Sequence, residues 1–141
     1  MATYNKFQQF VEDVLKGVHD FTSDSTCSVT VALCAAASAP VATNAVLADL
    51  TEVSYTNLSS RIVTGVTCDH TTGTASLTGV DLVLTASGAV ATFRYVVLYN
   101  DDPTTPANPL ICWFDYGSDV TMATSETFTI DFASGVIAIL T

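Results

Sequence analysis

The feature that most constrains the fold of this chain is a change of hydrophobic period between its first 20 residues and the rest. Apolar residues occur at positions 7, 10, 11, 14, 15 and 18, which is the spacing of one helix face. From residue 29 onward, apolar and polar residues alternate instead, as in Val29, Val31 and Leu33. Alternation of this kind is typical of strands with one buried face. The sequence therefore predicts one N-terminal helix and a mainly β remainder.

The β region contains about eight short alternating segments, separated by Gly, Pro, Asn and Ser. No second helix of the length needed for a βαβ unit is predicted, so we expect an antiparallel β-sandwich or jelly roll. Residues 39–53 are ambiguous, and we interpret them as a structured loop with a short helical turn.

The length of 141 residues fits a single domain. Within it we expect an amphipathic helix over residues 4–18, a hinge over residues 20–26 and the β-sandwich over residues 27–141. The first residues lack the pattern of a secretory signal, and no apolar segment has the length that spans a bilayer. We therefore expect synthesis in a cytoplasm.

The charge of the chain argues against two classes of partner. Its net charge is −10, with 14 acidic and four basic residues. Binding to nucleic acid or to an anionic membrane surface needs clustered Lys and Arg, and this sequence has no such cluster. We expect direct contact with neither.

A hairpin is predicted where two apolar runs flank a loop rich in Asn, Asp, Pro and Thr. We expect Tyr95–Asn100 and Leu110–Asp115 to pair antiparallel, with Asp101 to Asn108 as a solvent-facing loop. Four aspartates lie in or near this hairpin: Asp101, Asp102, Asp115 and Asp119. Their spacing lacks the pattern of a calcium loop, so a plain turn is favoured over a surface cation or a catalytic site.

Other candidate chemistry is sparse. The four cysteines are widely spaced: Cys27, Cys34, Cys68 and Cys112. We interpret them as small buried hydrophobic residues rather than as zinc ligands or disulfides. The histidines, His19 and His70, are expected at the surface, and no nucleophile motif lies near them. We therefore predict no catalytic residue, no cofactor and no metal.

The aromatic residues concentrate on the two strands of the predicted hairpin. Four of them are expected to pack in the core: Phe93, Tyr95, Trp113 and Phe114. Tyr99 and Tyr116, which we place nearest the loop, are candidates for a contact surface because Tyr is enriched at interfaces.

Five stretches, distributed over most of the chain, are informative when they are considered jointly: ATYNKFQQFVEDV, APVATNAVLADLTEV, FRYVVLYND, ICWFDYGS and ETFTIDF. Together they resemble small structural proteins encoded by tailed bacteriophages. These stretches are folding motifs rather than active-site motifs. The resemblance implies a non-enzymatic virion protein, made in the host bacterial cytoplasm. It points further to a capsid decoration (cement) protein that binds the outer capsid surface and bridges coat subunits.

The resemblance also implies partners. We expect contact with the major capsid protein or other virion proteins. We also expect a homo-oligomer and take a trimer as the working hypothesis. A tail, baseplate or host-binding component is the alternative, and a carbohydrate-active enzyme is a third class. The candidate partner contacts lie on the helix and the hairpin: Phe7, Phe10, Val14, Tyr99, Asp101, Asp102 and Tyr116. The N-terminal helix could cover its own sandwich or reach a neighbour.

Overall fold

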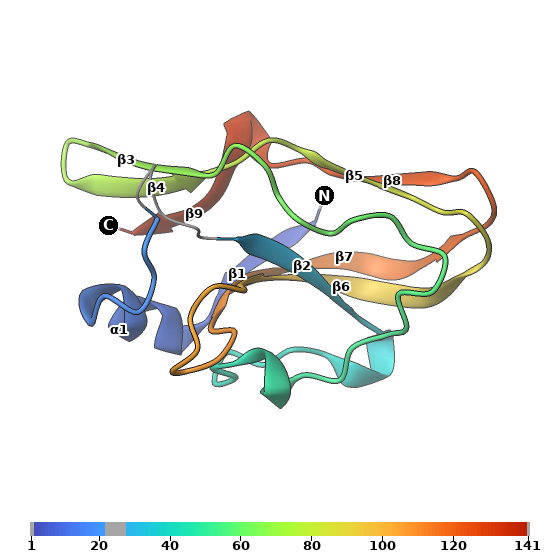
Figure 1. Cartoon of the computed structure of the whole chain (residues 1–141), viewed down its shortest axis with the longest axis horizontal. Coiled ribbons are helices and arrows are strands. Elements are labelled where there is room, and N and C mark those ends of the chain that lie inside the picture. Colours follow the sequence, from blue (N-terminus) through green and yellow to red (C-terminus); the bar gives the residue numbers. More distant parts are fainter. Residues whose placement is uncertain (1, 22–27, 141) are drawn as a thin grey trace.

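Antiparallel strands form two layers, with one helix beside them at one end (Figure 1). The computed structural model describes residues 2–21 and 28–140. The first layer is a four-stranded sheet with the following order: β1 (Thr3–Lys6), β7 (Leu110–Met122), β6 (Val90–Asn100) and β2 (Val29–Cys34). The fold is mainly β and is consistent with the expected β-sandwich.

The second layer consists of two smaller sheets that lie over the first (Figure 1). One sheet has three strands in this order: β3 (Thr67–Thr71), β4 (Thr74–Thr78) and β9 (Val136–Leu140). The other pairs β5 (Leu82–Thr85) with β8 (Thr127–Ile130). Between β8 and β9 the chain makes the short 3-10 turn η3 (Ala133–Gly135). The second layer is therefore interrupted where the first is continuous.

The predicted hairpin is confirmed as the pair β6 and β7. Tyr95 lies opposite Asp115, and Tyr99 lies opposite Leu110. The backbone N–H of Asn100 donates to the carbonyl of Pro109 at 3.0 Å. Most of the residues between the strands are exposed, as expected for a solvent-facing loop.

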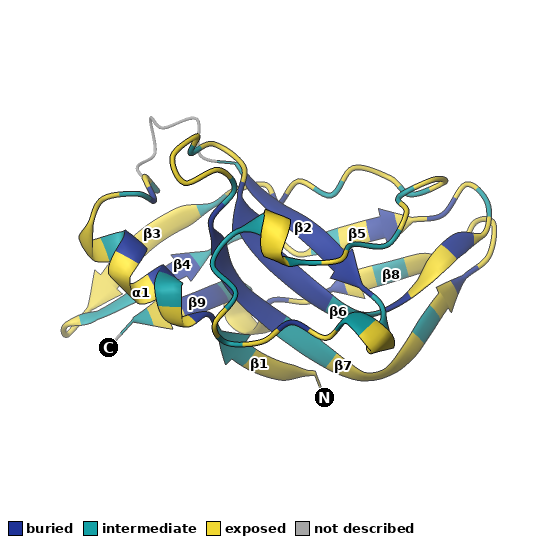
Figure 2. Ribbon diagram, turned by 90° about the horizontal axis from the view of Figure 1, so that it is seen from below, coloured by how far each residue is buried: buried dark blue, intermediate teal, exposed yellow. Residues whose placement is uncertain are grey.

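The centre of the first sheet is covered on both faces. All six residues of β2 are buried, as are the last five residues of β6, Val96 to Asn100 (Figure 2). One face meets the second layer. Residues 35–50 cover part of the other face of this sheet. They include two short 3-10 helices, η1 (Ala36–Ser38) and η2 (Leu47–Asp49). Within residues 39–53, where a loop with a short helical turn was expected, η2 is that turn.

The helix is shorter than predicted. The helix α1 spans Gln8–Leu15, whereas Thr3–Lys6 forms strand β1. Tyr4 fits a strand because its ring packs against Phe114 across the β1–β7 pair, with 5.6 Å between ring centroids. The buried face of the helix also differs from the expected one, since Leu15 is 85% exposed while Asp13 is buried.

The helix packs on its own sheet. Phe7 and Phe10 are fully buried, and the ring of Phe7 lies 4.5 Å from the ring of Trp113 on β7. Trp113 and Phe93 are core residues as predicted, whereas Tyr95 and Phe114 are half-buried. The expected hinge at residues 20–26 falls mostly outside the described residues, as does Cys27.

A two-stranded arm projects from the second layer at the left of Figure 1. Strand β3 is exposed at all five residues and pairs with β4. The turn at its tip places Thr72 and Gly73 in the left-handed region, with φ of 50° and 84°. The prediction that the cysteines are buried is therefore wrong for Cys68, because β3 lacks a covering layer, and is confirmed for Cys34 and Cys112.

Candidate functional site

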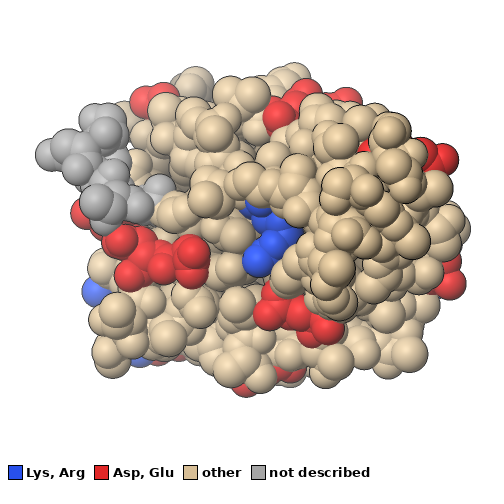
Figure 3. All heavy atoms as spheres, turned by 45° about the vertical axis from the view of Figure 1, so that its right-hand side comes forward, with Lys and Arg blue, Asp and Glu red and all other residues tan. Residues whose placement is uncertain are grey.

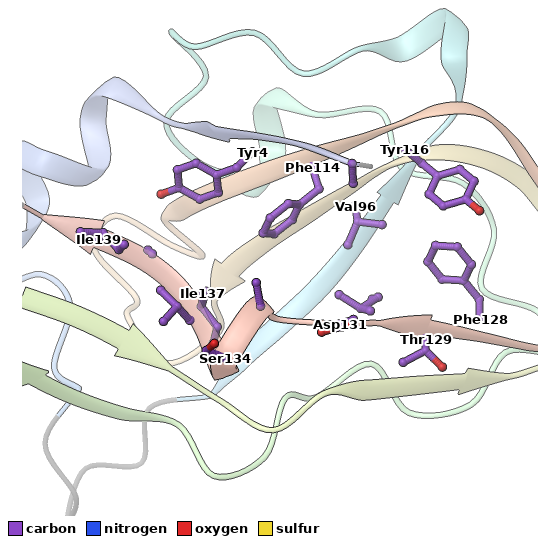
Figure 4. A pocket seen from close by; sticks show the side chains of 15 residues that line it. Tyr4, Val96, Phe114, Tyr116, Phe128, Thr129, Asp131, Ser134, Ile137 and Ile139 are labelled. Carbon is purple, nitrogen blue, oxygen red and sulfur yellow. The ribbon is translucent and has the colours of Figure 1, made fainter.

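An apolar groove opens between the two layers on the side where β1 is the outermost strand (Figure 4). Its volume is about 810 Å³. Six of the residues that line it have large side chains and define what we call the edge groove: Tyr4, Phe114, Tyr116, Phe128, Ile137 and Ile139. The first three come from β1 and β7, and the other three come from β8 and β9. A volume and an apolar lining of this kind are typical of binding sites.

Strand geometry explains how these side chains converge. Alternate residues of a strand point to the same face, so Phe114 and Tyr116 of β7 both face the second layer. Tyr4 is in register with Phe114 and lies on the same face. The ring of Phe128 meets that of Tyr116 edge to face, at 5.4 Å between centroids. The two sheets of the second layer are joined by the turn η3, whose residues Ala133 and Ser134 also line the groove.

The wall of the groove is partly in contact with solvent. Tyr4, Tyr116 and Ile139 are 41%, 48% and 44% exposed. Burial raises the pKa of the Tyr4 hydroxyl, and a hydrogen bond with the backbone of Ile139 partly offsets that rise. The Tyr4 hydroxyl therefore lies near the backbone of β9 at one end of the groove.

The outer edge of β1 borders this groove and carries backbone groups that face away from the sheet. Phe7 donates its N–H to the carbonyl of Ile111, and the register continues to Asn5 opposite Trp113. In an antiparallel pair, residues that bond the neighbouring strand alternate with residues that do not. The backbone groups of Tyr4 and Lys6 therefore point outward. The described residues supply no hydrogen bond to these outward groups.

The opposite edge of the sheet is covered. Strand β2 is flanked by residues 52–63, whose backbone bonds to it at Val29, Val31 and Leu33. Leu33 donates to the Tyr55 hydroxyl at 3.0 Å, and the Tyr55 hydroxyl donates to Glu52. The guanidinium of Arg61 donates to the carbonyl of Val31 and lies 3.5 Å from the centre of the Tyr55 ring.

The predicted contact residues do not form one surface. Phe7, Phe10 and Tyr99 are buried within the chain, so their side chains offer little surface for the expected partner contact. Val14 is half-buried, and Asp101 and Asp102 are exposed on the loop. Tyr116 is exposed but follows Asp115 in the middle of β7, away from the loop. Of the predicted set, Tyr116 alone lies in the edge groove.

The four aspartates of the hairpin do not gather either. Asp115 accepts two hydrogen bonds from the Arg94 guanidinium, at 2.8 and 3.0 Å, and this pair lowers the pKa of the carboxyl. Asp101 and Asp102 lie at the loop end of the hairpin. Within the described ranges, no group of three or more His, Cys, Asp and Glu is placed to hold a metal ion.

A buried polar cluster lies where the chain leaves the helix. His19 is 8% exposed, so its expected place at the surface is wrong, whereas His70 is exposed as predicted. The His19 ring stacks on Phe21 and meets Phe10 edge to face. Burial lowers the pKa of His19 to about 4, although the nearby Asp13 carboxylate acts in the opposite direction.

Five residues of the groove wall were not foreseen as contacts: Tyr4, Phe114, Phe128, Ile137 and Ile139. In the sequence, these apolar residues alternate with others in the same way as the residues of a strand whose apolar face is buried in the core. No pattern within one segment shows that β1, β7, β8 and β9 meet around an open space.

No helix in the described part of the chain combines the length and the apolar character that crossing a bilayer requires. Comparisons with protein-family models, with curated proteins and with solved structures find no match to this chain.

Proposed function

We propose that this chain is a non-enzymatic structural protein of a bacteriophage virion, and that it acts as a capsid decoration protein. The observation that carries the proposal is the edge groove beside the outward backbone groups of β1. These features leave apolar side chains and hydrogen-bonding groups that a second protein can cover. Such a surface suits a protein that functions by binding other proteins. The resemblance of the five sequence stretches supports the same function.

The charge of the surface supports a position on the outside of the particle. Figure 3 shows one face, on which acidic atoms are spread widely and basic atoms are few. Such a surface is repelled by the phosphates of packaged DNA and is compatible with solvent. A decoration protein on a symmetric lattice binds many times, so contacts of modest affinity gain avidity. A jelly-roll connectivity and a trimeric homo-oligomer belong to this proposal.

The copy number in purified particles tests the proposal. Particles of a phage that encodes this chain would be purified and their proteins quantified by mass spectrometry against the major capsid protein. A decoration protein is expected in hundreds of copies per particle and accessible to an antibody on intact heads. A few copies, or dozens confined to tails, would instead indicate the tail, baseplate or host-binding class. Absence from particles would contradict both.

A further inference from the structure

We propose that the edge groove and the outer edge of β1 together bind an extended segment of a partner polypeptide. The segment would add beside β1 as a fifth strand of the four-stranded sheet and would place alternate side chains in the groove. The inference deepens the proposed function, on which it rests only for the identity of the partner as another virion protein. Its test uses no virion, so the two can fail separately.

The first argument concerns hydrogen bonds. Tyr4 and Lys6 are two residues apart on β1, and both present their N–H and carbonyl groups outward. This is the arrangement that an added strand uses, because main-chain bonds form at every second residue of an edge. At the covered edge of β2, the corresponding outward N–H and carbonyl groups are hydrogen-bonded to another segment of the same chain.

The second argument concerns side chains. A strand beside β1 would point every second side chain into the space between the layers, toward Phe128 and Ile139 of the second layer and beside Tyr116 of the first (Figure 4). The groove is mostly apolar, with Asp131 as the charged residue among those that line it. Apolar side chains at alternate positions would therefore be favoured, since they bury surface that is now in water.

The third argument decides among occupants. A second copy of this chain in the edge groove would bring the same net charge of −10, and like charges disfavour that contact, so the proposed homo-oligomer would use another surface. A small apolar molecule could fill the groove but would leave the outward backbone groups of Tyr4 and Lys6 unused. An uncharged or basic segment of a different protein satisfies both the groove and the edge.

A ribosome-displayed library of random peptides about eight residues long, the length of an ordinary strand, supplies the probe. Peptides would be selected on the immobilised full chain, and their affinities would be measured by fluorescence anisotropy. We expect enriched sequences with apolar residues at alternate positions. Their binding should shift the NMR signals of Tyr4, Phe128 and Ile139.

Two matched variants separate pairing from simple apolar contact. Tyr4→Thr and Tyr4→Pro both remove the ring, but only the proline also removes the outward N–H. We expect Tyr4→Pro to bind the selected peptide about tenfold more weakly than Tyr4→Thr does. NMR spectra of both free variants would verify that β1 remains paired with β7.

A modified peptide tests the same point on the unaltered protein. Methylation of the peptide amides that face β1 should abolish binding, whereas methylation of the amides on the other side should not. Equal binding of both peptides, or of both Tyr4 variants when folded, would overturn the proposal. So would failure of the library to enrich any alternating sequence, or self-association of the chain that buries the groove.

Discussion

The two edges of the four-stranded sheet differ in how their backbone groups are satisfied. At β2, the outward groups from the Val29 carbonyl to the Leu33 carbonyl bond to residues 53–63 of the same chain. At β1, the outward groups of Tyr4 and Lys6 receive nothing comparable from the described residues. An exposed edge is a template for further pairing, and proteins usually cover or blunt it. One edge is therefore closed by folding, whereas the other keeps outward groups that the described residues do not bond, as the proposed partner segment requires.

The largest expected effect tests how the β1 side is held. Trp113 lies on β7 under the ring of Phe7, so side-chain packing attaches the helix and β1 to the sheet. Trp113→Ala should lower the free energy of unfolding by about 3–5 kcal/mol, because it leaves a large cavity. Urea titration followed by circular dichroism would measure it. A loss below about 1 kcal/mol would show that Trp113 does not hold this side.

A smaller effect is expected from pH at the end of the sheet where the helix exit meets β6. His19 is buried with its pKa lowered from 6.5 to about 4, so the unfolded chain takes up the proton first as pH falls. The free energy of unfolding should therefore be highest above pH 6.5 and decline toward pH 4. The loss from this residue should be about 3 kcal/mol.

The variant His19→Gln isolates that loss from the titration of the acidic residues. Both proteins would be unfolded in urea at several pH values between 7 and 4. The wild type should lose more stability over this range than the variant. Parallel curves for the two proteins would mean that His19 titrates normally in the folded chain.

The next effect compares a hydroxyl at each edge. Tyr55→Phe removes the acceptor for the Leu33 N–H and the donor to Glu52 at the covered edge. It should cost about 2 kcal/mol, because buried polar groups lose their partners, and should speed amide exchange at Leu33. Tyr4→Phe removes a hydroxyl at the open edge, where the side chain is 41% exposed, and should change stability by less than about 0.5 kcal/mol. Equal costs would remove the distinction between the edges.

The smallest effect is expected at the loop that belongs to neither edge. Asp101 is exposed, and Asn keeps its shape while removing its charge. Asp101→Asn should change the free energy of unfolding by less than about 0.5 kcal/mol and leave peptide binding at the edge groove unchanged. Thermal melting and fluorescence anisotropy would measure both. A loss of more than about 1 kcal/mol would show that the loop carboxylate has a structural role.

The hairpin could be predicted because its information is local. Apolar runs on both sides of a loop of Asn, Asp and Pro define β6, the turn and β7 without reference to distant residues. The start of the helix could not be predicted in the same way. Lys6 fits a helix by propensity, and Tyr4 stands directly before the helical spacing of apolar residues. The contact of Tyr4 with Phe114, more than 100 positions later, favours a strand instead.

The candidate site was predictable only at Tyr116. Aromatic character favoured Tyr99 and Tyr116 equally, but strand register buries one against residues of β2 and leaves the other at the groove. The groove is lined by residues of β1, β7, β8 and β9 that are distant in sequence, and the cover of β2 depends on Arg61 and Tyr55 reaching it from a long irregular segment. Both are properties of long-range packing.

The arm formed by β3 and β4 has a practical consequence for engineering. Its tip at Thr72 and Gly73 is exposed and lies beyond the cover of either layer. Exposed loop tips are the positions where chains accept inserted sequence with least damage to the fold. A short epitope placed between these two residues would be carried clear of the edge groove. On a particle that binds the chain repeatedly, it would be presented as a dense regular array.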